Sequence, residues 1–534
     1  MMKRFSVLLL GIAASMGVAQ AALPTWGDQG NGTYINPILN ADYSDPDVIR
    51  VGEKYYMVAS DFHFMGMQVL ESDDMVNWRL LSQVYRRFDF PGWDSNEHYG
   101  GGSWAPSLRY HDGKFWVFFC TPDEGLFMSN ATNPAGPWSP LLNVCHEKGW
   151  EDPCPFWDED GQAYLGRSIL GAGPIILHRM SSDGTRLLDD GCTVYTGPVA
   201  EGTKIHKRDG YYYLSIPEGG VQTGWQTVLR SKNIYGPYEK RVVLEQGTTA
   251  INGPHQGAMV DTPDGEWYFF HFQQYNPLGR VVHLQPMHWE DGWPVVGVDI
   301  DRNGIGEPVT VWTKPGVEGD FAIQSPQTSD DFNGSRLGLQ WQFNHNPVDS
   351  AWSLSAREGM LTLQALHAAD FKAARNTLTQ KTVGYQGTAT VKMDFGRMAD
   401  GQRCGLACMG ARNNVIGVMK EQGKTMLYFE ADGKMVQTLK VAGKTVYLRL
   451  QADATANRYV LSYSRDGREF EPVGEPFAME FGNWKGVRVG LYCYNTVADG
   501  GQVSFDWFRY THDGPGNIGE TSLKSVKAWQ NAKE

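Results

Sequence analysis

The chain has 534 residues, a formal net charge of −13 and 12% aromatic residues. This acidic balance argues against nucleic acid or an anionic membrane as a partner, and beyond the N-terminus no stretch approaches the about 18 apolar residues that a membrane span needs. The seven cysteines form no C-x-x-C pair and match no zinc-site spacing, so we interpret them mostly as buried small side chains.

The first residues predict export. Lys3 and Arg4 precede the apolar run FSVLLLGIAASMGV, and AQA at 19–21 offers the small residues that a signal peptidase requires. We therefore expect residues 1–21 to be a cleaved signal peptide and the mature chain to be secreted or periplasmic, without membrane insertion.

A repeated pattern in the first half of the chain predicts its fold. A glycine followed three positions later by an aromatic residue opens five strand-like stretches, GEKYYMVAS, GKFWVFF, GQAYLGRS, GYYYLSI and GEWYFFHF. Four of these glycines follow an aspartate, which is a strong hairpin signal. Five units of about four strands predict a five-bladed β-propeller over residues 22–315, whereas the alternative, a β-sandwich, would not explain the even recurrence.

One polar or aromatic residue precedes each of these glycines at a similar distance. These residues are Asp45, Trp104, Asp152, Glu201 and Gln256, nine positions before the glycine in the last four copies and seven in the first. If each hairpin joins the first two strands of a blade, they lie on the innermost strands and converge near the propeller axis. Carboxylates are costly in a crowded interior, so three together favour a functional site over the alternative that each caps a blade turn.

Such a ring of acids is typical of glycoside hydrolysis. Acetal cleavage needs a proton for the leaving oxygen and a carboxylate on the other face of the sugar, and a third acid nearby can raise the pKa of the proton donor. Trp104 would add a flat apolar face on which a sugar ring stacks.

Several stretches in order along the chain carry a family resemblance. YINPILNADYSDPDVIRVGEKYYMVAS, GSWAPSLRYHDGKFWVFF, WEDPCPFWDEDGQAYLG, VAEGTKIHKRDGYYYLSIPEGG and PLGRVVHLQPMHWEDGWPVV together resemble glycoside hydrolase family 43. The resemblance is greatest to the exo-acting β-xylosidases and α-L-arabinofuranosidases that carry a C-terminal β-sandwich.

The resemblance implies a role for each acid. Asp45 matches the general base that activates water, Asp152 the acid that raises the pKa of the proton donor and orients it, and Glu201 the general acid, in an inverting mechanism. Asp42 and Asp47, the neighbours of the base, are interpreted as loop and turn acids.

The resemblance also implies four substrate-binding residues. Phe62 and Trp104 match aromatic residues that line the pocket for the terminal sugar, and Arg280 matches an arginine that contacts sugar hydroxyls. Gln256 stands where many members have a histidine that helps to hold a calcium ion or a water cluster, with His255 one residue earlier. This departure puts an axial calcium in doubt, so we expect no required cofactor and no metal in the catalytic site.

The second half predicts another all-β domain. After a linker at 316–328, short alternating stretches over 329–512 indicate a jelly-roll β-sandwich that resembles the family's concanavalin-like domain, followed by a polar tail at 513–534. Asp331 and Asp506 are candidate ligands of a structural calcium ion, the alternative being plain loop and strand-end acids. The sandwich either binds sugar or, as we favour, walls off the pocket and enforces exo action.

The sequence thus predicts an inverting exo-hydrolase that releases terminal α-L-arabinofuranose or β-D-xylose from hemicellulose polysaccharides or oligosaccharides. Two alternatives remain open: a non-catalytic sugar-binding protein, and a propeller hydrolase that acts on another glycan. A fructan-active enzyme is disfavoured because the expected W-M-N-D-P motif is absent.

Overall fold

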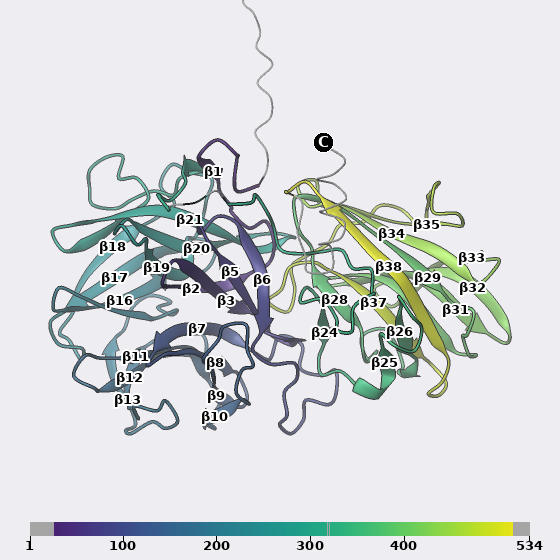
Figure 1. The fold of residues 1–534 in the computed structure, drawn as a ribbon, viewed down its shortest axis with the longest axis horizontal. Helices are drawn as coiled ribbons and strands as arrows, with labels where there is room; N and C mark the ends of the chain where they lie inside the picture. Colours follow the sequence, from purple (N-terminus) through teal and green to yellow (C-terminus); the bar gives the residue numbers. More distant parts are fainter. Residues whose placement is uncertain (1–25, 318, 320, 516–534) are drawn as a thin grey trace, which may run out of the picture.

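The computed structural model describes residues 26–317, 319 and 321–515, which form two all-β bodies side by side (Figure 1). The predicted signal peptide, and all but the first three residues of the predicted tail, lie outside the described residues. Within the described part of the chain, no helix has the length and apolar character of a membrane span.

The first body is a five-bladed propeller, which confirms the predicted fold. Each blade is a four-stranded antiparallel sheet whose strands follow one another in the chain, except that β4 leaves the first blade. In chain order the blades are β2 (Ser44–Val51), β3 (Lys54–Ser60), β5 (Gln68–Ser72) and β6 (Trp78–Gln83); β7 (Trp104–His111), β8 (Lys114–Thr121), β9 (Gly125–Ala131) and β10 (Leu142–Cys145); β11 (Trp150–Trp157), β12 (Ala163–Ile169), β13 (Ile175–Met180) and β14 (Cys192–Tyr195); β15 (Lys204–Arg208), β16 (Tyr211–Glu218), β17 (Trp225–Ser231) and β18 (Glu239–Leu244); and β19 (His255–Asp261), β20 (Trp267–Tyr275), β21 (Gly279–Glu290) and β22 (Trp293–Val296).

The repeated glycines join the first two strands of each blade, as the sequence predicts. All five have positive φ, from 64° at Gly52 to 87° at Gly265, a conformation that glycine adopts without steric cost. A two-stranded sheet of β1 (Thr33–Ile35) and β23 (Val311–Thr313) ties the start of the propeller to its end.

The second body is a β-sandwich of two large sheets, also as predicted. One sheet has the order β33 (Lys434–Lys440), β32 (Lys424–Ala431), β31 (Asn413–Glu421), β30 (Gln402–Met409), β37 (Arg488–Asn495), β28 (Leu378–Lys381), β24 (Gln342–Asn344) and β4 (Phe64–Met65), with β27 (Leu366–His367) pairing with β37. The other has the order β25 (Trp352–Ser353), β26 (Leu361–Gln364), β38 (Gln502–His512), β29 (Gln386–Asp394), β34 (Thr445–Asp453), β35 (Arg458–Ser464) and β36 (Glu471–Pro472). A single 3₁₀ turn, η1 (Asp349–Ala351), precedes β25.

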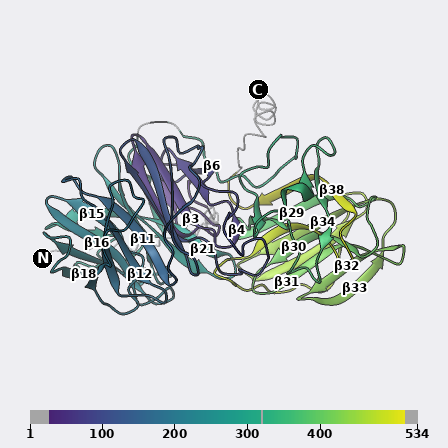
Figure 2. The same ribbon diagram turned by 90° about the horizontal axis from the view of Figure 1, so that it is seen from below.

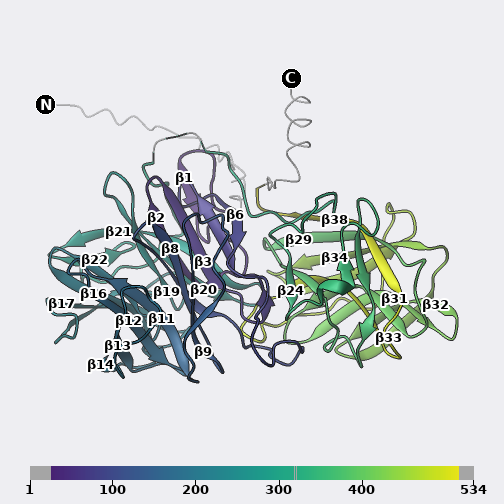
Figure 3. The same ribbon diagram turned by 60° about the horizontal axis from the view of Figure 1, so that its bottom comes forward.

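A short strand from the propeller completes one sheet of the sandwich. β4 lies in the loop between β3 and β5 of the first blade, next to the sandwich (Figure 2). Its Met65 pairs with Phe343 of β24. The views of Figures 1 and 3 agree that the first blade faces the sandwich. Since both residues of this pair belong to one apolar core that continues through the two bodies, the sandwich is fixed against the propeller rather than tethered to it.

Candidate active site

A β-bulge interrupts the inner strand of every blade near its start. The register with the second strand shifts by one residue between Ser44 and Asp47, Trp104 and Ser107, Glu151 and Cys154, and His255 and Gly257. The fourth blade follows the same geometry, because the Glu201 N–H donates to the Pro217 carbonyl ahead of the Lys204–Ser215 pair. The residue at the bulge has positive φ in every blade: Asp45 (54°), Ala105 (35°), Asp152 (52°), Gly202 (63°) and Gln256 (41°).

The bulges sort the predicted site residues into two registers. Asp45, Asp152 and Gln256 are equivalent, but Trp104 and Glu201 precede the bulge by one residue, so a similar distance from the glycine does not give all five the same position in their blades. Counting back from the hairpin glycine failed because the hairpins differ in length. The residues equivalent to Trp104 and Glu201 are Ser44, Glu151 and His255.

Two residues of the acid cluster, Glu151 and His255, were therefore missed by sequence reasoning. The only signal for them was the pair of polar residues in W-E-D and P-H-Q, where the residue before the bulge is as polar as the residue at it. The strained backbone of Asp45 and Asp152 is typical of functional sites, because a non-glycine residue at positive φ persists only where the surrounding structure imposes it. We call the end of the channel where these acids lie the front mouth.

Asp45 is buried and held from both sides. Its Oδ1 accepts a hydrogen bond from Arg280 Nη1 at 2.9 Å, and its Oδ2 accepts from Ser44 Oγ at 2.9 Å and Ser60 Oγ at 2.6 Å. Arg280 Nη1 also donates to Ser44 Oγ at 2.8 Å. Every contact donates to the carboxylate, so its orientation is fixed before any substrate binds.

Asp152 lies among the other acids. Its Oδ2 accepts hydrogen bonds from the Gly202 N–H at 2.6 Å and from Gln256 Nε2 at 3.2 Å. Burial, followed by the charges of Glu151, Glu201 and Asp45, raises the pKa of Asp152 well above its usual range, and the Gly202 N–H only partly opposes this. Gln256 thus supports Asp152 at the position where the resemblance implies a histidine.

Glu151 and Glu201 complete the cluster. Burial and the charge of Glu201 raise the pKa of Glu151 to about 7, although the Ala172 N–H donates to its Oε2 at 3.0 Å. His255 Nε2 lies 2.8 Å from Glu201 Oε1. Burial, together with the crowding of like charges, therefore keeps protons on Glu151 and Asp152.

The same cluster has the spacing of a metal site. One carboxylate oxygen from each of Glu151, Asp152 and Glu201 lies within 4.8 Å of the others, the one group of this kind in the described ranges. The predicted calcium ligands lie elsewhere: Asp331 forms an ion pair with Arg509, and Asp506 pairs with Lys392 at 2.6 Å. The structure thus favours the alternative interpretation of these two acids, because a lysine or arginine already neutralises each one.

Aromatic residues from both bodies surround the acids. Phe62 meets Trp104 edge-on with 5.9 Å between ring centroids, and Trp104 meets Trp484 in the same way at 5.8 Å. The guanidinium of Arg280 lies 5.9 Å from the ring centroids of both Phe481 and Trp484. Phe481 and Trp484 belong to the sandwich, in the loop before β37, and sequence reasoning did not identify either of them as a site residue.

The same sandwich loop reaches the acids through Asp42. Lys485 Nζ donates to Asp42 Oδ2 at 3.0 Å and to the Ser60 carbonyl at 3.1 Å, and the Gly486 N–H donates to Asp42 Oδ2 at 3.0 Å. Asp42 Oδ1 in turn accepts from the backbone N–H of Arg280 at 2.9 Å. Burial alone would raise the pKa of Asp42, but Lys485 and the two N–H donors hold it below its usual value. Asp42 thus lies in the loop before β2, as predicted, but it is also a buried ion-pair partner that links the sandwich to Arg280.

Asp47 departs from the predicted turn. It lies fully buried within β2, where its Oδ2 accepts hydrogen bonds from Arg109 Nη1 and from the Leu108 N–H, both at 2.7 Å. Alternation along the strand places it further down the channel than Asp45, where it joins neighbouring blades.

Comparison with known proteins agrees with this architecture. Residues 34–294 match Glycosyl hydrolases family 43, and residues 329–511 match the Beta xylosidase C-terminal Concanavalin A-like domain. A putative beta-xylosidase from Xylanibacter ruminicola is 60% identical over 465 residues, which cover 87% of each chain. The non-reducing end alpha-L-arabinofuranosidase BoGH43B from Bacteroides ovatus is 29% identical, over 90% of this chain and 94% of its own.

Solved structures show the same two-body arrangement. The xylan beta-1,4-xylosidase from Bacillus halodurans C-125 superposes with a TM-score of 0.79 at 26% identity, over 89% of this chain and 99% of its own. A bifunctional GH43-CE protein from Bacteroides eggerthii gives a TM-score of 0.81 at 30% identity, over 89% of this chain and 63% of its own. The resemblance read from the sequence is thus confirmed, and the chain belongs to glycosyl hydrolase family 43.

Proposed function

We propose that the front mouth hydrolyses the terminal glycosidic bond of xylose- or arabinofuranose-bearing chains with inversion of configuration. The observation that carries this proposal is that acids from different blades gather around Asp152: one carboxylate oxygen from each of Glu151, Asp152 and Glu201 lies within 4.8 Å of the others, and, after burial and these neighbours, the charge of Asp45 also raises the pKa of Asp152. One buried carboxyl group therefore senses two acids that approach the axis from different blades, which is the arrangement that an acid–base pair around a glycosidic oxygen needs.

Asp45 is the general base in this proposal. Arg280, Ser44 and Ser60 fix the orientation of its carboxylate, so that one oxygen can accept a proton from a water molecule as that water attacks the anomeric carbon. Arg280 also holds a guanidinium where sugar hydroxyls would lie, beside Phe481 and Trp484.

Glu201 is the general acid. It donates a proton to the leaving oxygen, and it lies in a cluster whose other members, Glu151 and Asp152, both hold protons more tightly than ordinary carboxyl groups. Asp152 acts through Glu201, because Gly202 and Gln256 anchor its carboxyl group beside Glu201 and it passes no proton to the leaving oxygen. His255 fixes the other side of Glu201.

We propose that this step requires no metal ion. The carboxylates with metal-ligand spacing include Glu201, and a cation on that oxygen would displace the proton that the leaving group must receive. A cation and a general acid are therefore alternatives at the same atoms.

The sandwich loop makes the enzyme exo-acting in this proposal. Trp484 is 48% exposed and its ring meets Trp104 at the edge of the acid cluster, so the loop closes one side of the front mouth. A blocked side leaves room for a chain end and not for a continuous polysaccharide. Xylosides rank first as substrates because the relative that is 60% identical is named a putative beta-xylosidase, and arabinofuranosides rank second because of BoGH43B.

A substrate screen tests the proposal. Nitrophenyl β-D-xyloside and nitrophenyl α-L-arabinofuranoside are assayed first, followed by oligosaccharides from xylan, arabinan and xyloglucan. We expect single pentoses as products, from the non-reducing end. The absence of turnover on all of them would support a sugar-binding protein instead.

We also propose that the chain is exported, on the basis of residues 1–21. Mass spectrometry of the protein from a secreting host should give a mature N-terminus after residue 21. A chain that retains Met1 in the cytoplasm would contradict export.

A further inference from the structure

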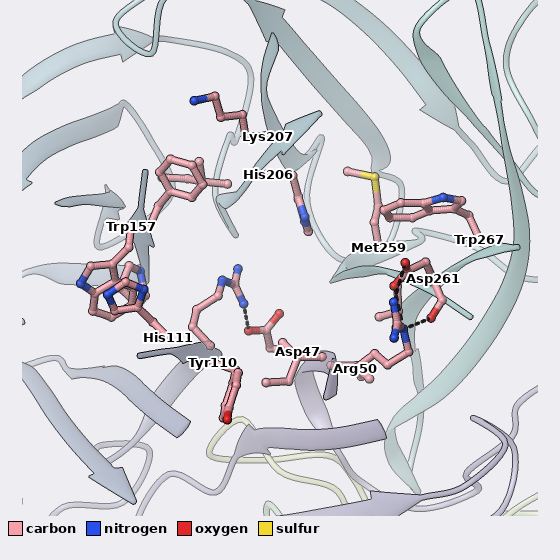
Figure 4. Close-up of a pocket in the computed structure, with 17 residues that line it drawn as sticks. Asp47, Arg50, Tyr110, His111, Trp157, His206, Lys207, Met259, Asp261 and Trp267 are labelled. Atoms are coloured by element: carbon pink, nitrogen blue, oxygen red, sulfur yellow. Dashed lines mark hydrogen bonds and ion pairs between the residues drawn. The ribbon is translucent and has the colours of Figure 1, made fainter. Parts of the chain in front are cut away.

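The propeller channel has a second opening at the end opposite the acids, which we call the rear mouth. It is a hollow of about 400 Å³ lined by three or four successive residues from each of the inner strands β2, β7, β11, β15 and β19, all beyond the bulges, and by Trp267 of β20 (Figure 4). This volume falls in the range of small-molecule sites, about 300–1,000 Å³.

Two polar atoms in this hollow have no hydrogen-bond partner among the described residues. They are Oδ1 of Asp47, a fully buried side chain whose other oxygen is bound to Arg109, and Nε2 of His206. Burial, and then the charge of Arg109, lower the pKa of His206 to about 4, so its ring is neutral at neutral pH and each nitrogen can either donate or accept. Buried polar atoms are normally paired, and an unpaired carboxylate oxygen in a hollow calls for a donor from a ligand or water.

The surrounding charges select a neutral ligand. Asp47 lies between two cations, Arg109 at 2.7 Å and Lys204 at 3.9 Å, so a further cation would be repelled. An anion would face the free oxygen of Asp47. On the rim, Arg50 is already paired with Asp261 at 2.8 Å. The group that suits both unpaired atoms is a hydroxyl, which can donate to the carboxylate and exchange a hydrogen bond with the imidazole.

Aromatic faces flank these two atoms. Trp157 stacks on His111 with 4.7 Å between centroids and 7° between planes, and Tyr110 is 48% exposed. Figure 4 shows Trp157 and His111 on one side of the hollow and Trp267 on the other, with His206 and Asp47 between them. Such rings offer flat apolar faces to the C–H side of a sugar ring, while the polar pair meets its hydroxyls.

We infer that the rear mouth is a second, non-catalytic carbohydrate site for a neutral pentose unit. A sugar hydroxyl donates to Asp47 Oδ1, another contacts His206 Nε2, and the ring lies against Trp157 or Tyr110. Only the identity of the sugar rests on the proposed function; the preference for a neutral polyhydroxy ligand follows from the rear mouth itself. Binding here would keep a chain or a product next to the enzyme without blocking the front mouth.

Calorimetric titration of the full chain carrying Glu201→Gln tests this inference, because this substitution removes the proton donor and leaves the probe intact. Xylobiose is the first probe and arabinobiose the second. We expect two binding sites per chain. Adding Trp157→Ala should weaken one of them about tenfold, which corresponds to about 1.4 kcal/mol, and leave the other unchanged.

Tyr110→Ala repeats the test at an exposed position, in case Trp157→Ala disturbs the third blade. Tyr235→Ala, at a 39% exposed tyrosine of the fourth blade outside the hollow, is the matched control and should leave both sites unchanged. A crystal of Glu201→Gln grown with xylobiose should show sugar in the rear mouth.

Three results would overturn the inference: a single site per chain, two sites that neither rear variant weakens, or a rear mouth that holds water only. These outcomes are independent of the proposed function. Failure of hydrolysis with two intact sites would contradict the enzyme assignment alone, and hydrolysis with a single site would contradict the rear site alone.

Discussion

At the front mouth of the channel, Asp45, Glu151, Asp152 and Glu201 face one another, and Arg280 is the cation paired with Asp45. At the rear mouth, on the same inner strands, Asp47 and Asp261 each lie against an arginine. At the front mouth, burial and like charges raise the pKa values of Glu151 and Asp152, so these carboxyl groups hold protons. At the rear mouth, arginines neutralise the aspartates, while Asp47 Oδ1 and His206 Nε2 have no hydrogen-bond partner among the described residues. One scaffold therefore supports proton transfer at one end and recognition at the other.

The strongest test of this contrast removes the proposed acid. We expect Glu201→Gln to lower kcat/KM on xylobiose by about 10²–10⁴-fold, because the sugar leaving group needs a proton and general acid catalysis is lost while the side chain keeps its size. The matched control is Glu290→Gln, at a side chain 70% exposed on β21, which should keep full activity. A loss of less than about tenfold in a folded Glu201→Gln protein would remove Glu201 from the mechanism.

The next test separates the front mouth from its support in the sandwich. Lys485→Met leaves Asp42 buried without its cation, so we expect the free energy of unfolding to fall by about 3–5 kcal/mol and kcat/KM to fall with it, as Arg280 loses its fixed position. Urea denaturation of the full chain measures the first effect.

A control pair and a rescue make this test specific. Lys392→Met breaks a half-exposed pair with Asp506 and should cost only about 0–1 kcal/mol. The double variant Asp42→Asn/Lys485→Met should recover part of the stability, because no unpaired charge is then buried. Equal losses in Lys485→Met and Lys392→Met would contradict a link between the two bodies through Asp42.

Protonation of Glu151 in the folded protein predicts that stability depends on pH. Glu151 has a pKa raised from 4.5 to about 7 in the folded state, so its stabilising contribution is complete below about pH 4.5 and is lost as the pH rises through 7. Glu151→Gln is neutral at every pH and keeps the acceptor for Ala172. From pH 4.5 to 8, we expect the variant to gain up to about 3 kcal/mol of unfolding free energy relative to the parent, at about 1.4 kcal/mol per pH unit.

Thermal or urea unfolding of both proteins across this pH range provides the measurement, with Glu290→Gln as the control for an exposed glutamate. Parallel stability curves for Glu151→Gln and the parent would show that the front mouth does not hold a proton on Glu151.

The smallest expected effect concerns the sandwich loop before β37, which closes one side of the front mouth. Trp484→Ala should lower kcat/KM on nitrophenyl β-D-xyloside about tenfold through the loss of one aromatic face, and should raise the relative rate on longer oligosaccharides. Trp312→Ala on β23, 37% exposed, is the matched control. An unchanged preference for chain length would show that the loop before β37 does not define exo action.

Much of the fold could be predicted from the sequence because its signals are local. A glycine at positive φ and an aromatic residue three positions later mark every first hairpin, so the number of blades follows from counting. Counting positions back from these glycines also identified Asp45, Asp152 and Gln256, which do occupy equivalent positions. It misplaced Glu201 and missed Glu151, because the bulge and the variable hairpins each shift the alignment by one residue.

The contribution of the sandwich to the site could not be predicted in this way. Lys485 contacts the Ser60 carbonyl across 425 residues of sequence, and the two-residue strand β4 is too short to show any periodicity. Contacts of this kind depend on how two separately patterned bodies pack. Asp42 illustrates the consequence, since its role depends on a partner that no local pattern identifies.

The central claim is that the acids of the front mouth form a water-activating base and a proton donor. Proton NMR of the first sugar released from nitrophenyl β-D-xyloside tests it most directly, because the anomeric signal is read before mutarotation. Direct attack of water activated by Asp45 predicts α-xylose as the first product. A first product in the β form would mean that configuration is retained, and would contradict the role of Asp45 and the account of the front mouth built on it.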